Sequence, residues 1–508
     1  MNDFLQRLTA LTPARLGGIR RGIEKESLRA LPDASLALTA HPKALGSALT
    51  HPSITTDYSE SQLELITGAH ALVDDCVHEL TQTHQFVYRA LLEQGNEQLW
   101  VSSMPCALPS DETIPIARFG TSNVGRAKSI YRVGLGHRYG RRMQTISGIH
   151  YNWSLPGVYS EDYFGLIRNF RRNAFLLLYL FGASPALCPS FAKGRDHGLQ
   201  TLSEKSLYMP YGTSLRMGRL GYQSDAQSTL AVSYNSLDGY AASLNDALTR
   251  PYHAYEPIGT RTPGGDYQQL ATTLLQIENE FYGTIRPKRT IFPGERPLHA
   301  LRERGVEYVE VRLMDLDPFE TVGINAQTMR FLDVFLLHCL LSNSPPDSRA
   351  EIDEIKHNQH HTAARGREPG LTLKRSGAEV ALSSWASEIL AQCEPIAASL
   401  DQAHCSTDYS RALTMAHNRL ADPSQTPSAR VLAAMAASHD NNFVSFIQTQ
   451  SLKAKNDLLA MPWSPLEQAQ FVALTEKSLA DQRAIEVADV LDFETYRKQY
   501  MSPERLLV

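Results

Sequence analysis

The sequence predicts an α+β fold, in which strands and helices are mixed at first and a run of helices follows. Several short segments before about residue 315 alternate apolar and polar residues, as strands with one buried face do. From about residue 325 onward, apolar residues recur every three or four positions, which is the spacing of a buried helix face. Strands and helices do not alternate regularly, so the pattern does not indicate a parallel sheet of βαβ units.

Five segments have the period-two pattern of strands, and each carries polar side chains on one face. In 145–155, for example, Ile149 and Tyr151 alternate with His150 and Asn152. The predicted strands are 18–29, 54–67, 145–155, 274–282 and 306–313.

The remaining regular segments have helical spacing, and two of them begin with clear N-terminal signals. Thr426 precedes Pro427, and Ser464 is followed by Pro465 and Glu467 as in a capping box. The predicted helices are 1–12, 45–49, 73–94, 160–182, 325–341, 383–404, 427–461 with a break near Asp440, and 465–500. The segments 100–145, 200–235 and 343–372 are predicted to be mainly irregular.

The overall composition is that of a globular protein and argues against several functional classes. The net charge of −5 over 508 residues is not that of a general nucleic-acid-binding protein, which usually has a basic excess. The N-terminus has no basic start followed by an apolar run, and the most apolar stretch, 174–188, is too short to span a bilayer. Six cysteines without a CxxC pair are expected to be reduced thiols. We therefore expect a cytoplasmic protein that binds neither membranes nor nucleic acid.

Acidic side chains gather on the polar faces of the predicted strands. Glu24 and Glu26 are two residues apart, so both carboxylates project from the same face of a strand. Taken alone, this pair also fits a solvated strand face, because Arg and Lys residues flank it. The other polar faces carry Glu60 and Glu64 with Asp57 just upstream, His150 with Asn152, and Glu310 with Arg312.

Four such faces in one antiparallel sheet would line a single cavity with carboxylates and one imidazole. Mg²⁺ prefers oxygen ligands and usually completes its shell with phosphate oxygens of a substrate. The joint pattern therefore indicates phosphoryl chemistry with ATP and Mg²⁺ rather than redox chemistry. Arg312 is the candidate cation beside the transferred phosphoryl group, since a guanidinium is always charged and can bind phosphate through two donors.

Three other motifs carry no assignment. The segment 120–127 approaches a phosphate-binding loop but lacks its lysine and hydroxyl, and 134–139 lacks the third glycine of a dinucleotide fingerprint. His360 and His361 are expected to be a surface pair in a loop, because zinc ligands are rarely adjacent.

The chain closely resembles glutamate–cysteine ligases (γ-glutamylcysteine synthetases) of the proteobacterial type over about residues 17–373. The helices that follow show only looser similarity. The matching blocks are GIRRGIEKESLR, HPKALGSALTHPSITTDYSESQLELIT, SSMPC, FGTSNVGRAKSIYRVGL, RYGRRMQTISGIHYNWSLP, LFGASPALC, YGTSLRMGRLGY, LQIENEFYGTIRPKR, GVEYVEVRLMDLDPF and PGLTL. Blocks of this length and number are highly specific.

The resemblance implies a fold like that of glutamine synthetase, with a curved, mostly antiparallel sheet that forms a funnel-shaped site. It implies a catalytic core at 1–373 and a helical C-terminal part at 374–508 that packs on this core as one functional unit. No second ligase domain is expected after residue 373. The implied reaction joins the γ-carboxylate of L-glutamate to the amino group of L-cysteine through γ-glutamyl phosphate, with ATP as co-substrate. This reaction is the first step of glutathione biosynthesis.

The resemblance also implies roles for individual residues. The metal ligands would be Glu24, Glu26, Asp57, Glu60, Glu64, His150 and Glu310, holding Mg²⁺ or Mn²⁺. Arg312, Glu310 and His150 would be the catalytic residues. The substrate-binding residues would be Arg216, Tyr222 and Tyr282 around the cysteine carboxylate, Tyr58, Tyr131 and Leu135 around its thiol, and Arg132, Gln144 and Ile146 in the amino-acid sites. Tyr58 stands where relatives have Phe, so its hydroxyl could alter the thiol pocket.

Two alternatives remain open at this point. A ligase on the same fold could use a different amine, and the pocket around Tyr58, Tyr131 and Leu135 would then differ. A catalytically silent protein would have lost metal ligands, yet every carboxylate position is filled. We expect a monomer with three small-molecule substrates: glutamate, cysteine and ATP.

Overall fold

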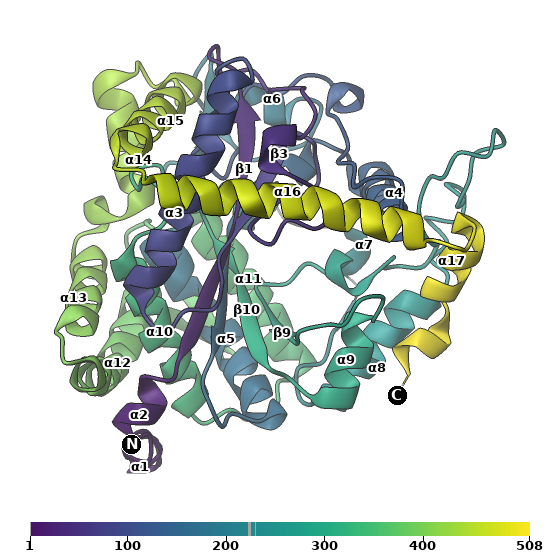
Figure 1. Cartoon of the computed structure of the whole chain (residues 1–508). Coiled ribbons are helices and arrows are strands. Elements are labelled where there is room, and N and C mark those ends of the chain that lie inside the picture. The colour runs from purple at the N-terminus through teal and green to yellow at the C-terminus, as the bar shows by residue number, and fades with distance from the viewer. Residues whose placement is uncertain (1, 222–224, 229, 508) are drawn as a thin grey trace.

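A seven-stranded antiparallel sheet forms the centre of the molecule (Figure 1). The computed structural model describes residues 2–221, 225–228 and 230–507. The strands follow the order β2-β3-β1-β5-β10-β9, and β4 pairs with the end of β1. They are β1 (Arg20–Ala30), β2 (Ile54–Thr56), β3 (Gln62–Ile66), β4 (Gln98–Leu99), β5 (Ile149–Ser154), β9 (Ile285–Lys288) and β10 (Tyr308–Met314). The predicted α+β class with a mostly antiparallel sheet is confirmed.

Helices surround this sheet, and they are the regular elements of the described chain after residue 381. The helices are α1 (Asn2–Thr9), α2 (Pro13–Leu16), α3 (Val73–Glu93), α4 (Asn123–Tyr139), α5 (Ser160–Phe181), α6 (Pro189–Ala192), α7 (Asp225–Ser228), α8 (Leu237–Thr249), α9 (Pro297–Arg304), α10 (Ala326–Leu341), α11 (Arg349–Arg365), α12 (Leu382–His404), α13 (Asp408–Ala421), α14 (Pro427–Ser438), α15 (Phe443–Ala460), α16 (Pro465–Ala488) and α17 (Phe493–Tyr500). Two small sheets are formed by β6 (Ala186–Leu187), β7 (Gln200–Ser203) and β8 (Ser206–Tyr208), and by β11 (Thr372–Arg375) and β12 (Ala378–Ala381).

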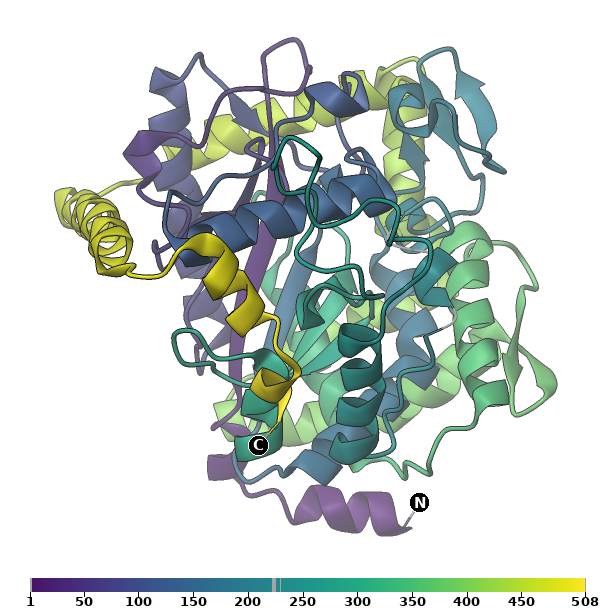
Figure 2. The ribbon, with the colours of Figure 1, turned by 90° about the vertical axis from the view of Figure 1, so that its right-hand side faces the viewer.

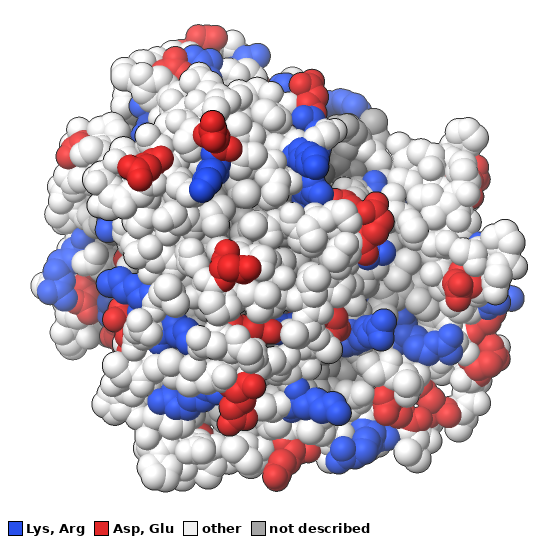
Figure 3. All heavy atoms as spheres, turned by 90° about the horizontal axis from the view of Figure 1, so that it is seen from above, with Lys and Arg blue, Asp and Glu red and all other residues white. Residues whose placement is uncertain are grey.

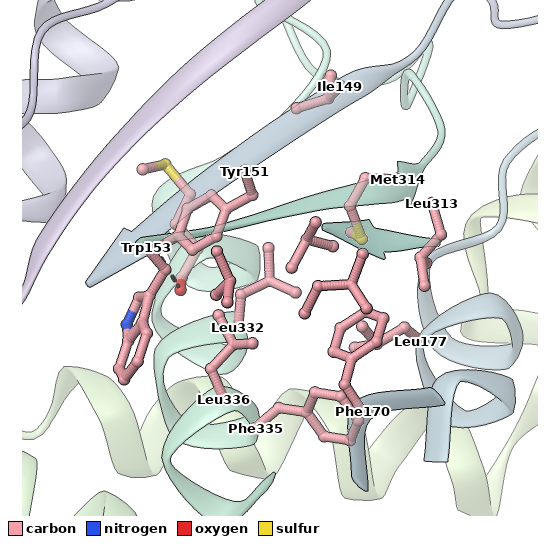
Figure 4. Packing of buried hydrophobic residues seen from close by; sticks show 14 of the residues in the cluster. Ile149, Tyr151, Trp153, Phe170, Leu177, Leu313, Met314, Leu332, Phe335 and Leu336 are labelled. Atoms are coloured by element: carbon pink, nitrogen blue, oxygen red, sulfur yellow. Dashed lines mark hydrogen bonds between the residues drawn. The ribbon is translucent and has the colours of Figure 1, made fainter. Parts of the chain in front are cut away.

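One face of the central sheet packs against α5 and α10 (Figure 4). Ile149, Tyr151 and Trp153 of β5 lie on this face and are almost completely buried. The helices contribute Phe170, Leu177, Leu332, Phe335 and Leu336 to the same cluster. Because successive strand residues face opposite sides, His150 between Ile149 and Tyr151 points away from this core.

The register of the sheet brings the predicted polar residues together on the other face. The paired residues are Glu24 with His150, Glu26 with Glu64, and Glu310 with Asn152. Directly paired side chains in an antiparallel sheet have Cβ atoms about 5 Å apart. The strand pairing alone therefore places these carboxylates and the imidazole within contact range of one another.

The helices α16 and α17 run across the outside of the molecule, over α3, α4 and the start of α9. In Figure 1, α16 crosses in front of α3 and β1, and Figure 2 shows α17 passing from α4 toward α9. Ser47 donates a hydrogen bond to Gln482 of α16 over 2.6 Å. Arg296, just before α9, donates to the carbonyl of Tyr500 over 2.9 Å. The predicted capping box at Ser464 and Glu467 is present at the start of α16.

The predicted strand 54–67 is a hairpin of two strands, β2 and β3. The intervening turn is held by side chains that bond to backbone groups elsewhere. Ser59 donates to the carbonyl of Pro115 over 2.6 Å, and Ser61 donates to that of Ala37 over 2.5 Å. Such local hydroxyl bonds compete with strand pairing.

The prediction of a strand at 274–282 is wrong. A single 3-10 turn, Glu278–Glu280, lies within an otherwise irregular segment. Both glutamates are buried, and each pairs with an arginine over 2.8 Å: Glu278 with Arg296, and Glu280 with Arg138. Their alternation reflects two buried ion pairs and not the two faces of a strand. The strand β9 begins directly afterwards, at Ile285.

Two segments that were predicted to be irregular contain long helices, so these predictions are wrong. In α4, the glycines that indicated a loop allow close approach of other groups. A Cβ at Gly134 would lie 2.4 Å from the Gln276 amide oxygen, and one at Gly136 would lie 2.7 Å from the Tyr58 hydroxyl. The second missed helix, α11, is polar and carries His360 and His361, which therefore lie on a helix and not in a loop.

Smaller differences concern helix ends. The predicted helix 45–49 is replaced by a 3-10 turn at Lys43–Leu45. The predicted helix 465–500 is divided into α16 and α17, because Asp492 caps a new helix by accepting a hydrogen bond from the Thr495 amide.

The surface carries charges of both signs, and the cysteines are not paired with one another. Lysine, arginine, aspartate and glutamate side chains are interspersed on the face shown in Figure 3. Over the described residues, no helix has the length and apolar character needed to cross a membrane. All six cysteines are free thiols, and Cys405 is the exposed one.

Candidate active site

A cavity of about 470 Å³ lies over the polar face of the central sheet. Its floor is made by strands β1, β3, β5 and β10, and its walls are made by α4, α17 and the irregular segment around residue 280. The predicted site residues that line it are Glu24, Glu26, Asp57, Tyr58, Glu64, Tyr131, Arg132, Leu135, Gln144, His150, Tyr282, Glu310 and Arg312. Segments far apart in the sequence therefore meet at one cavity.

His150 stands between two groups of carboxylates. Its Nδ1 lies 3.1 Å from Glu24 Oε2 and 4.0 Å from Glu310 Oε1, while its Nε2 lies 3.7 Å from Glu26 Oε1. The imidazole is almost completely buried. Burial, together with the positive charge of Arg312, lowers the pKa of His150. A neutral imidazole can serve as a metal ligand.

The first group of carboxylates, Glu24 and Glu310, is surrounded by donors and cations. Asn152 donates to Glu24 Oε1 over 2.9 Å. Lys288 Nζ lies 3.1 Å from Glu310 Oε1, and Arg312 Nη1 lies 3.0 Å from Glu310 Oε2. Burial opposes ionisation, but the charges of Lys288 and Arg312 hold the pKa of Glu310 well below its ordinary value. This group is ionised and its charge is balanced.

The second group, Glu26 and Glu64, is less fully compensated: the charges of Arg216 and Arg312 act on Glu26 and that of Arg132 acts on Glu64, but burial and repulsion outweigh them. Burial and the nearby charge of Asp57 raise the pKa of Glu26 to about 8. Burial and repulsion by Glu24, Asp57 and Glu26 raise the pKa of Glu64 well above its ordinary value. The Gly148 amide donates to Glu26 Oε2 over 2.8 Å, which holds this carboxylate in place. Buried carboxylates that repel one another bind either protons or a cation.

The donor set fits divalent cations. Ligand atoms of Glu24, His150 and Glu310 lie within 4.8 Å of one another, and so do those of Glu26, Glu64 and His150. Oxygen donors with one nitrogen suit Mg²⁺ or Mn²⁺. A divalent cation would balance the charge that now raises the pKa values of Glu26 and Glu64.

The end of the cavity near α4 is apolar and aromatic. Tyr58, Tyr131 and Leu135 belong to one buried cluster there. Arg132 lies at the edge of this cluster, with its Nη2 4.0 Å from Asp57 Oδ1. Gln144 donates to the hydroxyl of Tyr282 over 2.8 Å. The predicted thiol-pocket residues are thus together in space.

Tyr58 lines this cavity, and its hydroxyl packs against α4. The hydroxyl is buried without a hydrogen-bond partner and lies close to where a Cβ on Gly136 would be. Only a glycine leaves room for it at that position, since a Cβ would lie 2.7 Å from the oxygen. The extra hydroxyl of Tyr58 is therefore packed against Gly136 of α4.

Three predicted residues are placed outside the cavity lining. The Glu60 carboxylate, in the turn of the β2–β3 hairpin, accepts hydrogen bonds from the amides of His41 and Arg118, each over 2.6 Å. Arg216 is buried beside Gly148 and lowers the pKa of Glu26 by its charge, and its Nη2 donates to the Arg312 carbonyl over 2.7 Å. Ile146 belongs to a separate buried cluster. A further predicted residue, Tyr222, lies outside the described residues.

Several lining residues were not predicted from the sequence. Lys288 follows a proline in a basic segment, and the alternation that would have marked β9 is only four residues long. Tyr496 and Tyr500 of α17 also line the cavity, and their rings stack with centroids 5.9 Å apart. They lie in the part of the chain where the family blocks had ended, so no sequence signal connected them with the site.

Comparisons with known proteins agree with this geometry. A sequence profile of the family described as "Glutamate-cysteine ligase" matches residues 5–160 and 156–362. The glutamate–cysteine ligase of Alcanivorax borkumensis is 48% identical, with 98% of this chain and 99% of that protein covered. That of Pseudomonas entomophila is 46% identical over 99% and 98% of the two chains.

Solved structures show the same fold. The glutamate–cysteine ligase of Francisella tularensis, in complex with AMP, superimposes with a TM-score of 0.90 at 36% identity and covers 95% of this chain and 97% of that one. A bifunctional glutathione synthetase from Pasteurella multocida superimposes with a TM-score of 0.71 at 23% identity, over 93% of this chain and 58% of that one, and supports the fold alone. The chain belongs to the glutamate–cysteine ligase family.

Proposed function

We propose that this protein joins the γ-carboxylate of L-glutamate to the amino group of L-cysteine with the energy of ATP. The products are γ-glutamylcysteine, ADP and phosphate, and the reaction is the first step of glutathione biosynthesis. The observation that carries this proposal is the cluster of Glu24, Glu26, Glu64, Glu310 and His150 in one cavity. It occurs in a chain that resembles glutamate–cysteine ligases over nearly its whole length.

The ligands proposed for Mg²⁺ are the two groups that share His150: Glu24 with Glu310, and Glu26 with Glu64. Asp57 lies on the same cavity wall as the second group. Bound Mg²⁺, or Mn²⁺ in its place, would neutralise phosphate charge and polarise the phosphoryl group. Glu60 is less well suited than the other predicted ligands, because backbone amides already occupy both of its oxygens.

The chain's own residues would act on the two anionic substrates. The glutamate γ-carboxylate attacks the γ-phosphorus of ATP, and ADP leaves with the electrons of the broken P–O bond. Arg312, which faces the cavity beside Glu310, would stabilise the charge that spreads over the transferred group. The cysteine amine then attacks the acyl phosphate carbon, and phosphate leaves. The walls formed by α4, α17 and the segment around residue 280 would limit the access of water to the acyl phosphate.

The amino-acid substrates would occupy the end of the cavity near α4. Tyr131 and Leu135 offer an apolar surface that suits a thiol side chain. Arg132 and Tyr282 lie in the same wall and could bind carboxylates. Arg216 is proposed to bind the cysteine carboxylate, as the family resemblance implies, and it also holds the backbone of Arg312 in place.

A direct assay tests this function. The purified protein is incubated with ATP, Mg²⁺, glutamate and one acceptor amine at a time, and γ-glutamyl product and released phosphate are both measured. We expect cysteine to be used far better than alanine or serine, with one phosphate released per product. If cysteine fails while another amine is ligated, the protein is a different carboxylate–amine ligase. The Glu64→Gln variant is the negative control for contaminating activity.

The remaining expectations are parts of the same proposal. The helical part 374–508 belongs to one functional unit with the core, which is supported by Tyr496 and Tyr500 in the cavity wall. A cytoplasmic location is supported by the free thiols. Light scattering of the purified protein will show whether it is the expected monomer.

A further inference from the structure

We propose that His357 and His361 of α11 bind Zn²⁺ together, with Glu379 of the β11–β12 hairpin as the third protein ligand. None of these residues lines the active-site cavity. The inference therefore goes beyond the proposed function and does not rest on it. It concerns a second metal site with a different ligand chemistry.

The histidines of α11 have a different relation in the structure than in the sequence. His360 and His361 are adjacent, which is unsuited to a shared metal. Because the segment is helical, His357 and His361 are about one turn apart and lie on the same face. Their ring centroids are 3.9 Å apart, with an angle of 35° between the ring planes. Two imidazoles at this helical spacing can bind one zinc ion together.

A cavity of about 280 Å³ adjoins both imidazoles. It is enclosed by the C-terminal part of α11, the segment that follows this helix and the hairpin β11–β12. Glu379 of β12 lines the same cavity, and its Oε2 accepts a hydrogen bond from Thr372 over 2.9 Å. This bond uses one carboxylate oxygen and leaves the other for a cation.

The hairpin that carries Glu379 is fixed to α11 directly beside the two histidines. Asn358 Nδ2 donates to the Lys374 carbonyl over 2.7 Å, and Asn358 Oδ1 accepts from the Lys374 amide over 2.8 Å. Glu354 of α11 accepts from the Gly377 amide over 2.8 Å. The third ligand is therefore held near the first two before a metal binds, which reduces the entropy lost on binding.

The two imidazoles are in the protonation state that metals require. Burial lowers the pKa of His357 and of His361, and the charges of Lys374 and Arg219 lower both further. The charge of Glu379 opposes this effect at His357. A metal binds the neutral imidazole, so zinc does not have to displace a proton from either ring at neutral pH.

Most of the charges around this cavity are balanced. Arg365 donates to both oxygens of Glu368, over 2.5 and 2.7 Å, and Lys374 stands opposite Glu379 in the hairpin. Arg219 lies outside the cavity lining but acts on both imidazoles, and its charge opposes a dication. The C-terminal end of α11 favours a cation, because helix carbonyls carry partial negative charge there.

The ligand set distinguishes this site from the active-site cluster. Two imidazole nitrogens and one carboxylate suit Zn²⁺, whereas Mg²⁺ prefers oxygen ligands alone. The active-site groups instead contain four glutamates around the single His150. Mg²⁺ in excess should therefore occupy the active site without competing for α11.

Zinc titration with two readouts tests the site in the full-length protein. The Cys405→Ser background is used because Cys405 is an exposed thiol that can bind zinc, and Mg²⁺ is kept in excess. We expect Zn²⁺ to slow hydrogen–deuterium exchange in peptides from 354–365 and 372–381. In calorimetry, His357→Ala and His361→Ala should each weaken one zinc site by about 10-fold or more, since loss of a group behind a metal ligand already costs that much.

Three matched variants separate zinc ligation from general effects. His360→Ala removes an imidazole that lines a different cavity, and it should leave zinc binding unchanged. Glu379→Gln should weaken zinc binding and remove the protection of the hairpin. Arg219→Gln should strengthen zinc binding, because it removes an opposing charge. Alanine favours the helix, and circular dichroism shows whether each variant is folded. His357→Gln and His361→Gln replace alanine variants that are not.

Each outcome supports or overturns the assignment. The active-site cluster is present in every variant, so a difference between variants reports on α11. If His357→Ala and His361→Ala bind zinc and protect both peptides as the parent protein does, there is no zinc site on this helix. If Glu379→Gln is unchanged in both readouts, the assignment of the third ligand is wrong. If inorganic phosphate protects these peptides, zinc does not, and Arg219→Gln abolishes the protection, the cavity is an anion site and the proposal fails.

Discussion

Two carboxylate groups share His150 but differ in how their charge is balanced. Glu24 and Glu310 have Asn152, Lys288 and Arg312 as partners, and they remain ionised despite burial. In the other group, Glu26 and Glu64, burial and repulsion between carboxylates outweigh the nearby arginines, and the pKa values of both are raised. In the first group the carboxylate charge is balanced without a metal. In the second group the carboxylates repel one another, and a bound cation would remove this repulsion. A buried cluster can therefore be assembled for function at the expense of local stability.

Removing a charge from the second group, Glu26 and Glu64, should have the largest effect on activity. Glu64→Gln or Glu26→Gln is expected to lower kcat by about 10³-fold or more, because each removes a ligand whose charge is needed in the transition state. The metal-free variants should be at least as stable as the wild-type protein toward urea, since repulsion is reduced. Steady-state rates and unfolding curves measure the two effects.

Glu60→Gln is the matched control for these variants. Its carboxylate is held by two backbone amides outside the cavity, so the variant should lose stability but keep most of its activity per folded molecule. A loss of activity as large as that of Glu64→Gln would indicate that Glu60 is a metal ligand.

Arg312→Lys tests the compensated group and should have the second-largest effect. Lysine keeps the charge but cannot bind phosphate through two donors, so we expect a loss of about 10²-fold in kcat. KM for cysteine should change little, because the cysteine pocket is near α4 at the other end of the cavity. An unchanged kcat would show that Arg312 serves only to balance Glu310.

The pH dependence of stability should reveal the stored repulsion. The pKa of Glu26 is about 8 in the folded protein, compared with an ordinary value of 4.5. Between these two pH values the folded protein keeps a proton that the unfolded chain releases. The free energy of unfolding of EDTA-treated protein should therefore fall as pH rises through this window, by at most about 1.4 kcal/mol per pH unit for this group.

Urea unfolding at several pH values measures this slope. The Glu26→Gln variant should have a flatter profile than the wild-type protein, and added Mg²⁺ should stabilise the wild-type protein more at pH 8 than at pH 6. Identical pH profiles for both proteins would mean that Glu26 is already ionised without a metal.

Tyr58→Phe should have the smallest effect, and it should not alter the charge balance of either carboxylate group. The variant removes a buried hydroxyl that has no hydrogen-bond partner, so we expect a gain of about 1 kcal/mol in stability. The ratio of kcat/KM for cysteine to that for serine should stay within about twofold, since the hydroxyl faces Gly136. A clear change in this ratio would show that the hydroxyl reaches the acceptor.

The sequence was sufficient to predict most of the floor of the cavity. Period-two alternation in β1, β5 and β10 is a local property, and an antiparallel sheet necessarily brings such polar faces together. The roles of Glu26, Glu64 and His150 came from the family resemblance, which is specific for these strands. Their pairing in the structure agrees with that resemblance, although their functions still require experiment.

The walls of the cavity could not be predicted in the same way. The glycines of α4 indicated a loop, but they are explained by contacts with Gln276 and Tyr58, which are distant in sequence. The alternation at 274–282 was misleading because Glu278 and Glu280 each have an arginine partner outside the segment. Lys288 was missed because a four-residue edge strand has too few residues to show a period. In each case the structure depends on information that a local sequence pattern does not contain.

The position of α17 has a consequence for the synthesis of the protein. The strands that carry the carboxylates leave the ribosome early, and they can pair long before Tyr496 and Tyr500 have been translated. The cavity wall is completed only when α17 docks between α4 and α9. A nascent or truncated chain would hold the acidic cluster without its full enclosure, and it would therefore be unable to sequester a reactive acyl phosphate.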